Sequence, residues 1–68
     1  MNITINGEPR EIETVAFLAE LLRRCDLDPE AMGIAVARNG EVIRRRDLGL
    51  TPVGEGDRIE IVRAVQGG

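Results

Sequence analysis

Residues 1–25, MNITINGEPREIETVAFLAELLRRC, decide the fold, because a strand pattern changes into a helix pattern within them. Ile3 and Ile5 alternate with polar residues, and this period of two is typical of a strand with one buried face. Asn6-Gly7 then supplies the left-handed backbone angles that a two-residue hairpin turn needs. The stretch is therefore predicted to open with a β-hairpin.

The return strand of this hairpin, EPREIE at residues 8–13, contains Pro9. Proline has no backbone N–H to donate to a neighbouring strand, so this strand is expected at the edge of a sheet. Ile12 is its one clear core residue.

An amphipathic helix is predicted over residues 15–25, because apolar side chains recur there at spacings of one, three and four. Thr14 is the expected N-cap, since its hydroxyl can accept a hydrogen bond from a backbone amide of the first turn. Pro29 is expected to end the helix. The apolar stripe of this helix comprises Phe17, Leu18, Leu21, Leu22 and Cys25.

A second hairpin is predicted where GIAVAR (33–38) and EVIRR (41–45) flank Asn39-Gly40. A connection rich in glycine and proline follows over residues 46–57. Its apolar residues are expected to cap the core, and they are Leu48, Leu50 and Val53.

The last predicted strand, RIEIVRAV at residues 58–65, is best placed in the centre of the sheet beside the first strand. This placement leaves the Pro9 strand at an edge. The predicted fold class is therefore α+β, a mixed sheet of four to five strands with one main helix packed across it. Residues 1–65 are expected to form a single domain, and residues 66–68 a mobile tail, because QGG offers nothing to bury.

Composition and charge exclude several classes of protein. The net charge is −3 and Phe17 is the only aromatic residue, which argues against a nucleic-acid binder with a basic face and stacking platforms. No stretch approaches the roughly 18 apolar residues of a membrane span, and MNITINGEPR lacks the apolar run of a signal peptide. A cytoplasmic protein, monomeric when free, is expected.

The residues of the chain also argue against an enzyme. A nucleophile needs a neighbouring base, and the sequence has no histidine, lysine or tyrosine. A single cysteine without histidine gives neither an internal disulfide nor a zinc site, so no metal and no stably bound cofactor are expected. Cys25 is interpreted as a small buried hydrophobe near the helix end, with a sulfur-accepting thiol as the alternative.

The end of the sequence, Gln66-Gly67-Gly68, is the remaining candidate for chemistry. Its carboxylate is an anion at neutral pH and a poor electrophile, so it must be activated before it can react. Glycine lets a backbone enter a narrow tunnel that side chains would block, and three residues reach about 10 Å. The tail is therefore interpreted as a substrate handle for a partner enzyme.

With these features the chain resembles the bacterial sulfur-carrier proteins of thiamine biosynthesis, small relatives of ubiquitin with the β-grasp fold. The resemblance covers nearly the whole length. It rests on the opening hairpin, the helix VAFLAELLRRC, the second hairpin GIAVARNGEVIRRRDL, and the final GEGDRIEIVRAVQGG. The Gly-Asp before the last strand and the terminal Gly-Gly are shared with sister families, whereas the short length and VQGG favour the thiamine branch.

The resemblance implies a mechanism in which partner enzymes perform the chemistry. An adenylating enzyme of the ubiquitin-activating type would use ATP and magnesium to form an acyl adenylate on Gly68. Sulfur from a donor such as a cysteine desulfurase system would then give a thiocarboxylate that thiazole synthase consumes. Gly68 would carry the sulfur and Gly67 would give it access.

A docking surface is predicted from strand alternation alone. If the isoleucines of the last strand face the helix, small apolar side chains lie on the open face of the sheet near the root of the tail. Such a flat patch is the kind of surface that a partner covers. The predicted docking residues are Val62, Ala64, Ala35 and Ala37, with Arg63 at the margin.

Other functions share the same tail. A sulfur carrier for molybdopterin, cysteine synthesis or transfer-RNA thiolation would look alike, and a ubiquitin-like modifier would join Gly68 to lysines of other proteins. A third class is a β-grasp adaptor with an inert tail. An iron–sulfur electron carrier is excluded, because it needs four cysteine ligands and the chain has one.

Overall fold

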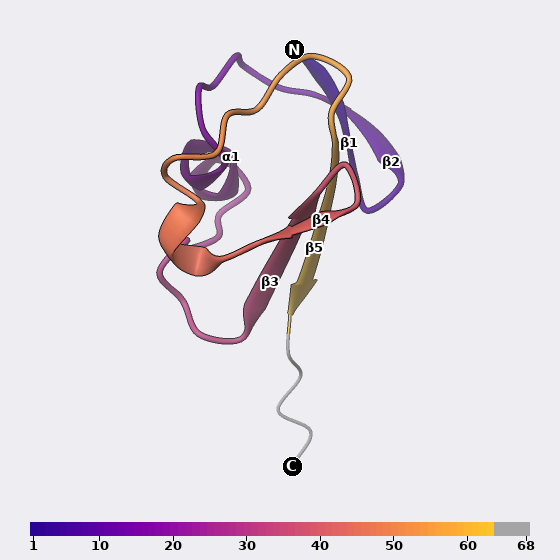
Figure 1. Cartoon of the computed structure of the whole chain (residues 1–68). Coiled ribbons are helices and arrows are strands. Elements are labelled where there is room, and N and C mark those ends of the chain that lie inside the picture. The colour runs from indigo at the N-terminus through magenta and orange to yellow at the C-terminus, as the bar shows by residue number, and fades with distance from the viewer. Residues whose placement is uncertain (64–68) are drawn as a thin grey trace.

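The structure is a computed structural model of the chain and describes residues 1–63 (Figure 1). Within this range a sheet of five strands packs against one α-helix. In chain order the elements are β1 (Asn2–Ile5), β2 (Glu8–Glu11), α1 (Leu18–Arg24), β3 (Ile34–Arg38), β4 (Glu41–Ile43), the 3₁₀ helix η1 (Arg45–Asp47) and β5 (Arg58–Arg63).

The strand order across the sheet is β2-β1-β5-β3-β4. β5 runs parallel to β1 and antiparallel to β3, so the sheet is mixed and its last strand is central. β2, which contains Pro9, lies at one edge. The predicted fold class, the central position of the last strand and the edge position of β2 are all confirmed.

Both predicted hairpin turns are confirmed. Asn6 and Gly7 have φ angles of 52° and 81°, and Asn39 and Gly40 have φ angles of 50° and 86°. These left-handed values are those of the two-residue turn that matches the twist of antiparallel strands. The second hairpin is shorter than predicted, because β4 ends at Ile43 and the chain then enters η1.

The helix begins later than the predicted residue 15, and Thr14 is not its N-cap. Phe17 takes the N-cap position in extended backbone conformation. The first amides of α1 are bonded by the long connection instead, since the N–H groups of Leu18 and Ala19 donate to the carbonyls of Thr51 and Leu48 at 2.9 and 3.0 Å. A distant loop thus provides the acceptors that a side-chain cap would otherwise supply.

The helix ends at Arg24, well before Pro29. Asp26 has a φ of 61°, and its N–H donates to the carbonyl of Arg23 while the N–H of Leu27 donates to the carbonyl of Leu22. This pair of bonds around a left-handed residue is a Schellman motif, which satisfies the last carbonyls of a helix. The prediction that Pro29 ends the helix is therefore wrong.

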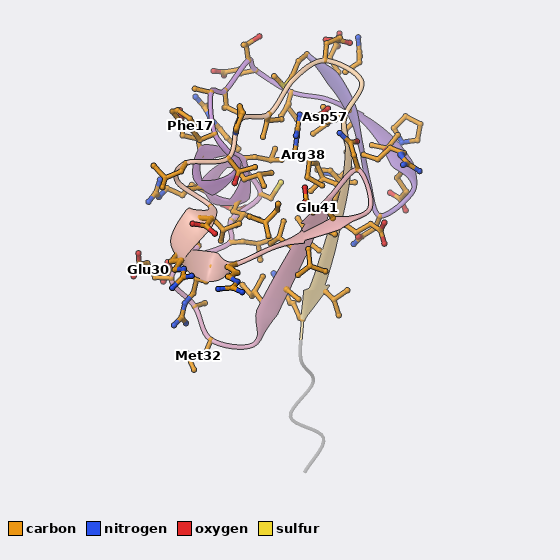
Figure 2. The ribbon with its side chains drawn as sticks, in the orientation of Figure 1. Phe17, Glu30, Met32, Arg38, Glu41 and Asp57 are labelled. Carbon is orange, nitrogen blue, oxygen red and sulfur yellow. The ribbon has the colours of Figure 1, made fainter. Side chains whose placement is uncertain are left out.

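The core lies between α1 and one face of the sheet, and the long connection closes it (Figure 1). Leu48 and Val53 are buried as predicted, but Leu50 is 74% exposed and does not cap the core. Phe17 is 39% exposed at the start of α1 (Figure 2). The buried apolar residues are Ile3, Ile5, Val15, Leu18, Ala19, Leu21, Leu22, Val36, Leu48, Val53 and Ile59.

Candidate functional site

β5 is the strand that leads to the predicted reactive tail. It runs between β1 and β3 and ends at Arg63, at the side of the molecule opposite the N-terminus (Figure 1). Gly67 and Gly68 lie outside the described residues, as does Ala64. The structure therefore describes the surfaces around the end of β5.

The start of β5 is fixed by a buried carboxylate. Asp57 is 8% exposed, and its Oδ2 accepts hydrogen bonds from Nε of Arg38 and from the backbone N–H of Gly54, both at 2.8 Å. Its Oδ1 accepts from Nδ2 of Asn39 at 3.2 Å. The carboxylate thus joins the second hairpin to the loop before β5, where Figure 2 labels Arg38 and Asp57.

Two opposing effects act on the pKa of Asp57. Burial raises this pKa, because it penalises the charged form, whereas the backbone of Gly54 and the side chains of Arg38 and Asn39 lower it. The donors outweigh burial, so the pKa of Asp57 lies below its ordinary value of 3.8. The group is therefore an ionised structural carboxylate at neutral pH.

Three of the predicted docking residues, Ala35, Ala37 and Val62, lie together on the open face of the sheet, and the register adds Val42 to them. Ala35 lies opposite Val62, and Ala37 lies opposite Val42 on β4. Val62 is 61% exposed and Val42 is 74% exposed. We call these four residues, Ala35, Ala37, Val42 and Val62, the open-face patch. Sequence reasoning missed Val42, although the two-residue turn at Asn39-Gly40 pairs Arg38 with Glu41 and therefore Ala37 with Val42.

Arg63 does not lie at the margin of the open-face patch. It is paired with Ile34 and is one residue after Val62, so it belongs to the helix side of the sheet. The prediction grouped it with Val62 through nearness in sequence, but neighbouring strand residues point to opposite faces.

On the helix side, Arg63 lines an open hollow of about 450 Å³ between the end of α1 and the end of β5. Arg10 of β2 and Arg24 of α1 contribute two more guanidinium groups to its lining, and Asp26 contributes a carboxylate. Arg24 is also paired with Glu13 at 3.1 Å. The two faces at the end of β5 therefore differ in chemistry: the open face carries the small apolar residues, with Glu60 opposite Ala37, and the helix side is rich in arginine.

Cys25 also lines this hollow. Its side chain is partly buried and packs against the core, in keeping with its interpretation as a small hydrophobe at the helix end. Its position in the wall of the hollow was not evident from the sequence.

Within residues 1–63, no cluster of three or more histidine, cysteine, aspartate or glutamate side chains is arranged to hold a metal ion. Across the same described range, no helix has the length and apolar character needed to cross a membrane.

Comparison with known proteins identifies the family. The sequence model of the ThiS family matches residues 3–68. The sulfur carrier protein ThiS of Thermus thermophilus is 35% identical over 66 residues, which cover 97% of this chain and 98% of that protein. A thiazole synthase of Magnetococcus marinus is 38% identical over 68 residues, and the chain spans 20% of the length of that enzyme.

The fold is shared with a solved member of the same family. The crystal structure of the thiamine biosynthesis protein ThiS from Geobacter metallireducens superimposes with a TM-score of 0.82 at 33% sequence identity, over the full length of both chains. The topology described above is thus the β-grasp fold of these proteins. By sequence and by structure, the chain belongs to the ThiS family.

Proposed function

We propose that this chain is a sulfur carrier of thiamine biosynthesis. In this proposal the carboxylate of Gly68 is adenylated by an enzyme of the ubiquitin-activating type, converted to a thiocarboxylate, and used by thiazole synthase as its sulfur source. The observation that carries the proposal is the family match over residues 3–68, which includes both glycines of the tail.

Two relatives support the separate parts of the proposal. The Thermus thermophilus protein, which is named a sulfur carrier, aligns with this chain over nearly its whole length. The Magnetococcus marinus thiazole synthase contains a segment similar to the whole of this chain. A carrier-like segment and a thiazole synthase thus occur in one polypeptide, which supports thiazole synthase as the partner that uses the sulfur.

The proposed chemistry follows from the weakness of a carboxylate as an electrophile. One oxygen of the Gly68 carboxylate bonds to the α-phosphorus of ATP and pyrophosphate leaves, with ATP and magnesium held by the adenylating enzyme. Sulfide delivered by the donor system then bonds to the carbonyl carbon, AMP leaves with one of the original oxygens, and loss of the S–H proton leaves the thiocarboxylate. Gly67 has no side chain, so the end of the chain can enter a narrow active site.

The open-face patch is the surface we propose for docking on the adenylating enzyme. Its valines are more than half exposed, and β5 carries one of them one residue before the described chain ends. A partner that covers Val62 and Ala35 removes apolar surface from water beside the root of the tail. Docking there brings Gly68 toward the partner's active site.

Reconstitution with purified enzymes tests the proposal. Thiazole synthase is incubated with its other substrates, the adenylating enzyme, ATP, magnesium and a sulfur donor, with and without this chain. Thiazole phosphate that forms only when the chain is present supports the proposal. The matched control is the chain without Gly68, which retains the folded body and is expected to give no product.

The same assay separates the pathways that share this tail. A molybdopterin synthase subunit or a cysteine-forming enzyme replaces thiazole synthase, and the thiocarboxylate form of the chain is offered to each in turn. Sulfur transfer to one of these enzymes, without transfer to thiazole synthase, would overturn the assignment to thiamine biosynthesis.

A further inference from the structure

β1 supports β5 over only part of its length. The N–H of Thr4 donates to the carbonyl of Asp57 at 3.0 Å, and the N–H of Asn6 donates to the carbonyl of Ile59 at 2.9 Å. After Asn6 the chain turns away into the first hairpin, whereas β5 continues to Arg63. The end of β5 therefore extends beyond the backbone of its parallel neighbour.

The side chain of Asn6 continues the support where the backbone of β1 stops. Its Oδ1 accepts a hydrogen bond from the N–H of Ile61 at 2.8 Å, and its Nδ2 donates to the carbonyl of the same residue at 3.1 Å. An amide side chain carries the same donor and acceptor as a peptide group. Asn6 thus supplies, from its side chain, the pair of bonds to Ile61 that a continued β1 strand would have made.

The second hairpin provides a natural counterpart at the other end of β5. Oδ1 of Asn39 accepts from the N–H of Arg58 at 2.9 Å, and the N–H of Asn39 donates to the carbonyl of Arg58 at 2.8 Å. Asn6 and Asn39 occupy the same left-handed position of their turns. One turn asparagine therefore fixes the start of the central strand, and the other fixes it near its end.

We propose that Asn6 is a positioning residue for the reaction at Gly68. By holding both backbone groups of Ile61, it acts with β3 to fix the position of the end of β5, from which the chain continues to its reactive end. This inference rests on the proposed function and names a residue that acts on the tail through β5. Its side chain has no part in the chemistry itself.

β3 pairs with β5 as far as Arg63, and Asn6 holds the other edge of the strand at Ile61, so the position of the end of β5 depends on both. Gly68 follows Arg63, the last residue paired with β3, by five residues, a reach of about 17 Å when extended at roughly 3.3 Å per residue. A shift of the end of β5 therefore moves the point from which these residues reach the partner's active site. Once the folded body has docked, a correctly placed end of β5 raises the effective concentration of the carboxylate in the partner's active site.

Asn6→Gly tests the inference with little backbone strain, because glycine adopts the φ of 52° at this position without a steric penalty. Asn39→Gly is the matched control, with the same substitution at the same turn position but at the start of β5. The kinetics of thiocarboxylate formation are measured for each variant by intact-protein mass spectrometry, with the adenylating enzyme, ATP, magnesium and a sulfur donor. Thermal unfolding verifies that both variants are folded at the assay temperature.

For Asn6→Gly we expect kcat to fall about tenfold with KM little changed. The folded body still docks on the partner, but the end of β5, from which the tail starts, is no longer held in place. Asn39→Gly also loses the bond to Asp57, so it is expected to lose more stability and yet to keep its kcat. If Asn6 acted only through the stability of the fold, Asn39→Gly, as the less stable variant, would lose more kcat than Asn6→Gly. Equal kcat for Asn6→Gly and the wild type, or equal losses in both variants, would overturn the inference.

Amide hydrogen exchange gives a second reading that does not depend on the reaction. In Asn6→Gly, exchange at Ile61 is expected to accelerate about tenfold while Arg58 is unaffected, and in Asn39→Gly the pattern is expected to reverse. Unchanged protection at Ile61 in Asn6→Gly would contradict the inference. Failure of the wild type to form a thiocarboxylate would instead count against the proposed function, and exchange at Ile61 would still decide whether Asn6 fixes the end of β5.

Discussion

Nε of Arg38 lies 2.8 Å from Oδ2 of Asp57, and this pair joins the end of β3 to the residue that precedes β5. The Asp57 side chain is 10% exposed and the Arg38 side chain 31% exposed, so the pair is largely shielded from water. The contact spans 19 residues of sequence. It fixes the entry of the central strand.

Replacement of this carboxylate is expected to destabilise the fold. Asp57→Ala leaves the Arg38 guanidinium, the Asn39 amide and the Gly54 N–H without their acceptor, and we expect a loss of about 2–3 kcal/mol in the free energy of unfolding. Urea denaturation of the variant and the wild type measures this difference in unfolding free energy. The control is Glu13→Ala, which removes the pair with Arg24 between side chains that are 74% and 52% exposed, and which should cost less than about 1 kcal/mol. Equal losses in the two variants would contradict the structural role of Asp57.

The lowered pKa of Asp57 predicts how stability depends on pH. Because the folded-state pKa lies below the unfolded value, the stabilisation from Asp57 is fully present above the ordinary value of 3.8 and is lost as the pH falls through the folded pKa. The unfolding free energies of the wild type and Asp57→Asn should therefore differ at pH 7 and converge as the pH is lowered step by step below 3.8. A constant difference at every pH would show that ionisation of Asp57 contributes nothing.

Two leucines of the long connection are expected to differ sharply. Leu48 is 4% exposed, whereas Leu50 is 74% exposed. Leu48→Ala should cost about 3 kcal/mol through lost burial and the cavity left behind, and Leu50→Ala should change stability by less than about 0.5 kcal/mol. Chemical denaturation of the two variants makes the comparison, and a large loss for Leu50→Ala would place that side chain in the core after all.

The open-face patch is tested by placing a charge on it. Val62→Asp should weaken binding to the adenylating enzyme about tenfold or more, because docking would then bury an unpaired carboxylate. Phe17→Asp is the matched control, since Phe17 is also exposed and aspartate is favoured at the N-cap position that it occupies. Isothermal titration calorimetry measures both affinities. Equal binding by Val62→Asp and the wild type would exclude the patch from the interface.

Local chemistry in the sequence predicts most of the fold. The two Asn-Gly pairs predict left-handed turns, and Pro9 predicts an edge strand. The alternation of Ile59 and Ile61 predicts a strand with one covered face. The structure contains all three features. Each of these follows from the residues at or beside the position concerned. Together they place β2 at an edge and pair β3 with β4.

The parts that sequence reasoning missed depend on contacts between distant segments. The start of α1 is fixed by carbonyls of residues 48 and 51, and Leu50 is exposed because the turn after η1 directs it outward. The bonds from Asn6 to Ile61 join residues that are 55 positions apart. A single sequence shows that an asparagine suits a turn, but it does not show which strand its amide reaches.

The central claim, that Gly68 carries sulfur, is tested most directly by intact-protein mass spectrometry. The chain is incubated with the adenylating enzyme, ATP, magnesium and a sulfur donor, beside one variant that lacks Gly68 and another that is extended beyond it. We predict that the wild type gains the mass difference between one sulfur and one oxygen, and that neither variant does. An unchanged wild-type mass under conditions that convert the Thermus thermophilus carrier, or the same gain in the variant without Gly68, would contradict the claim.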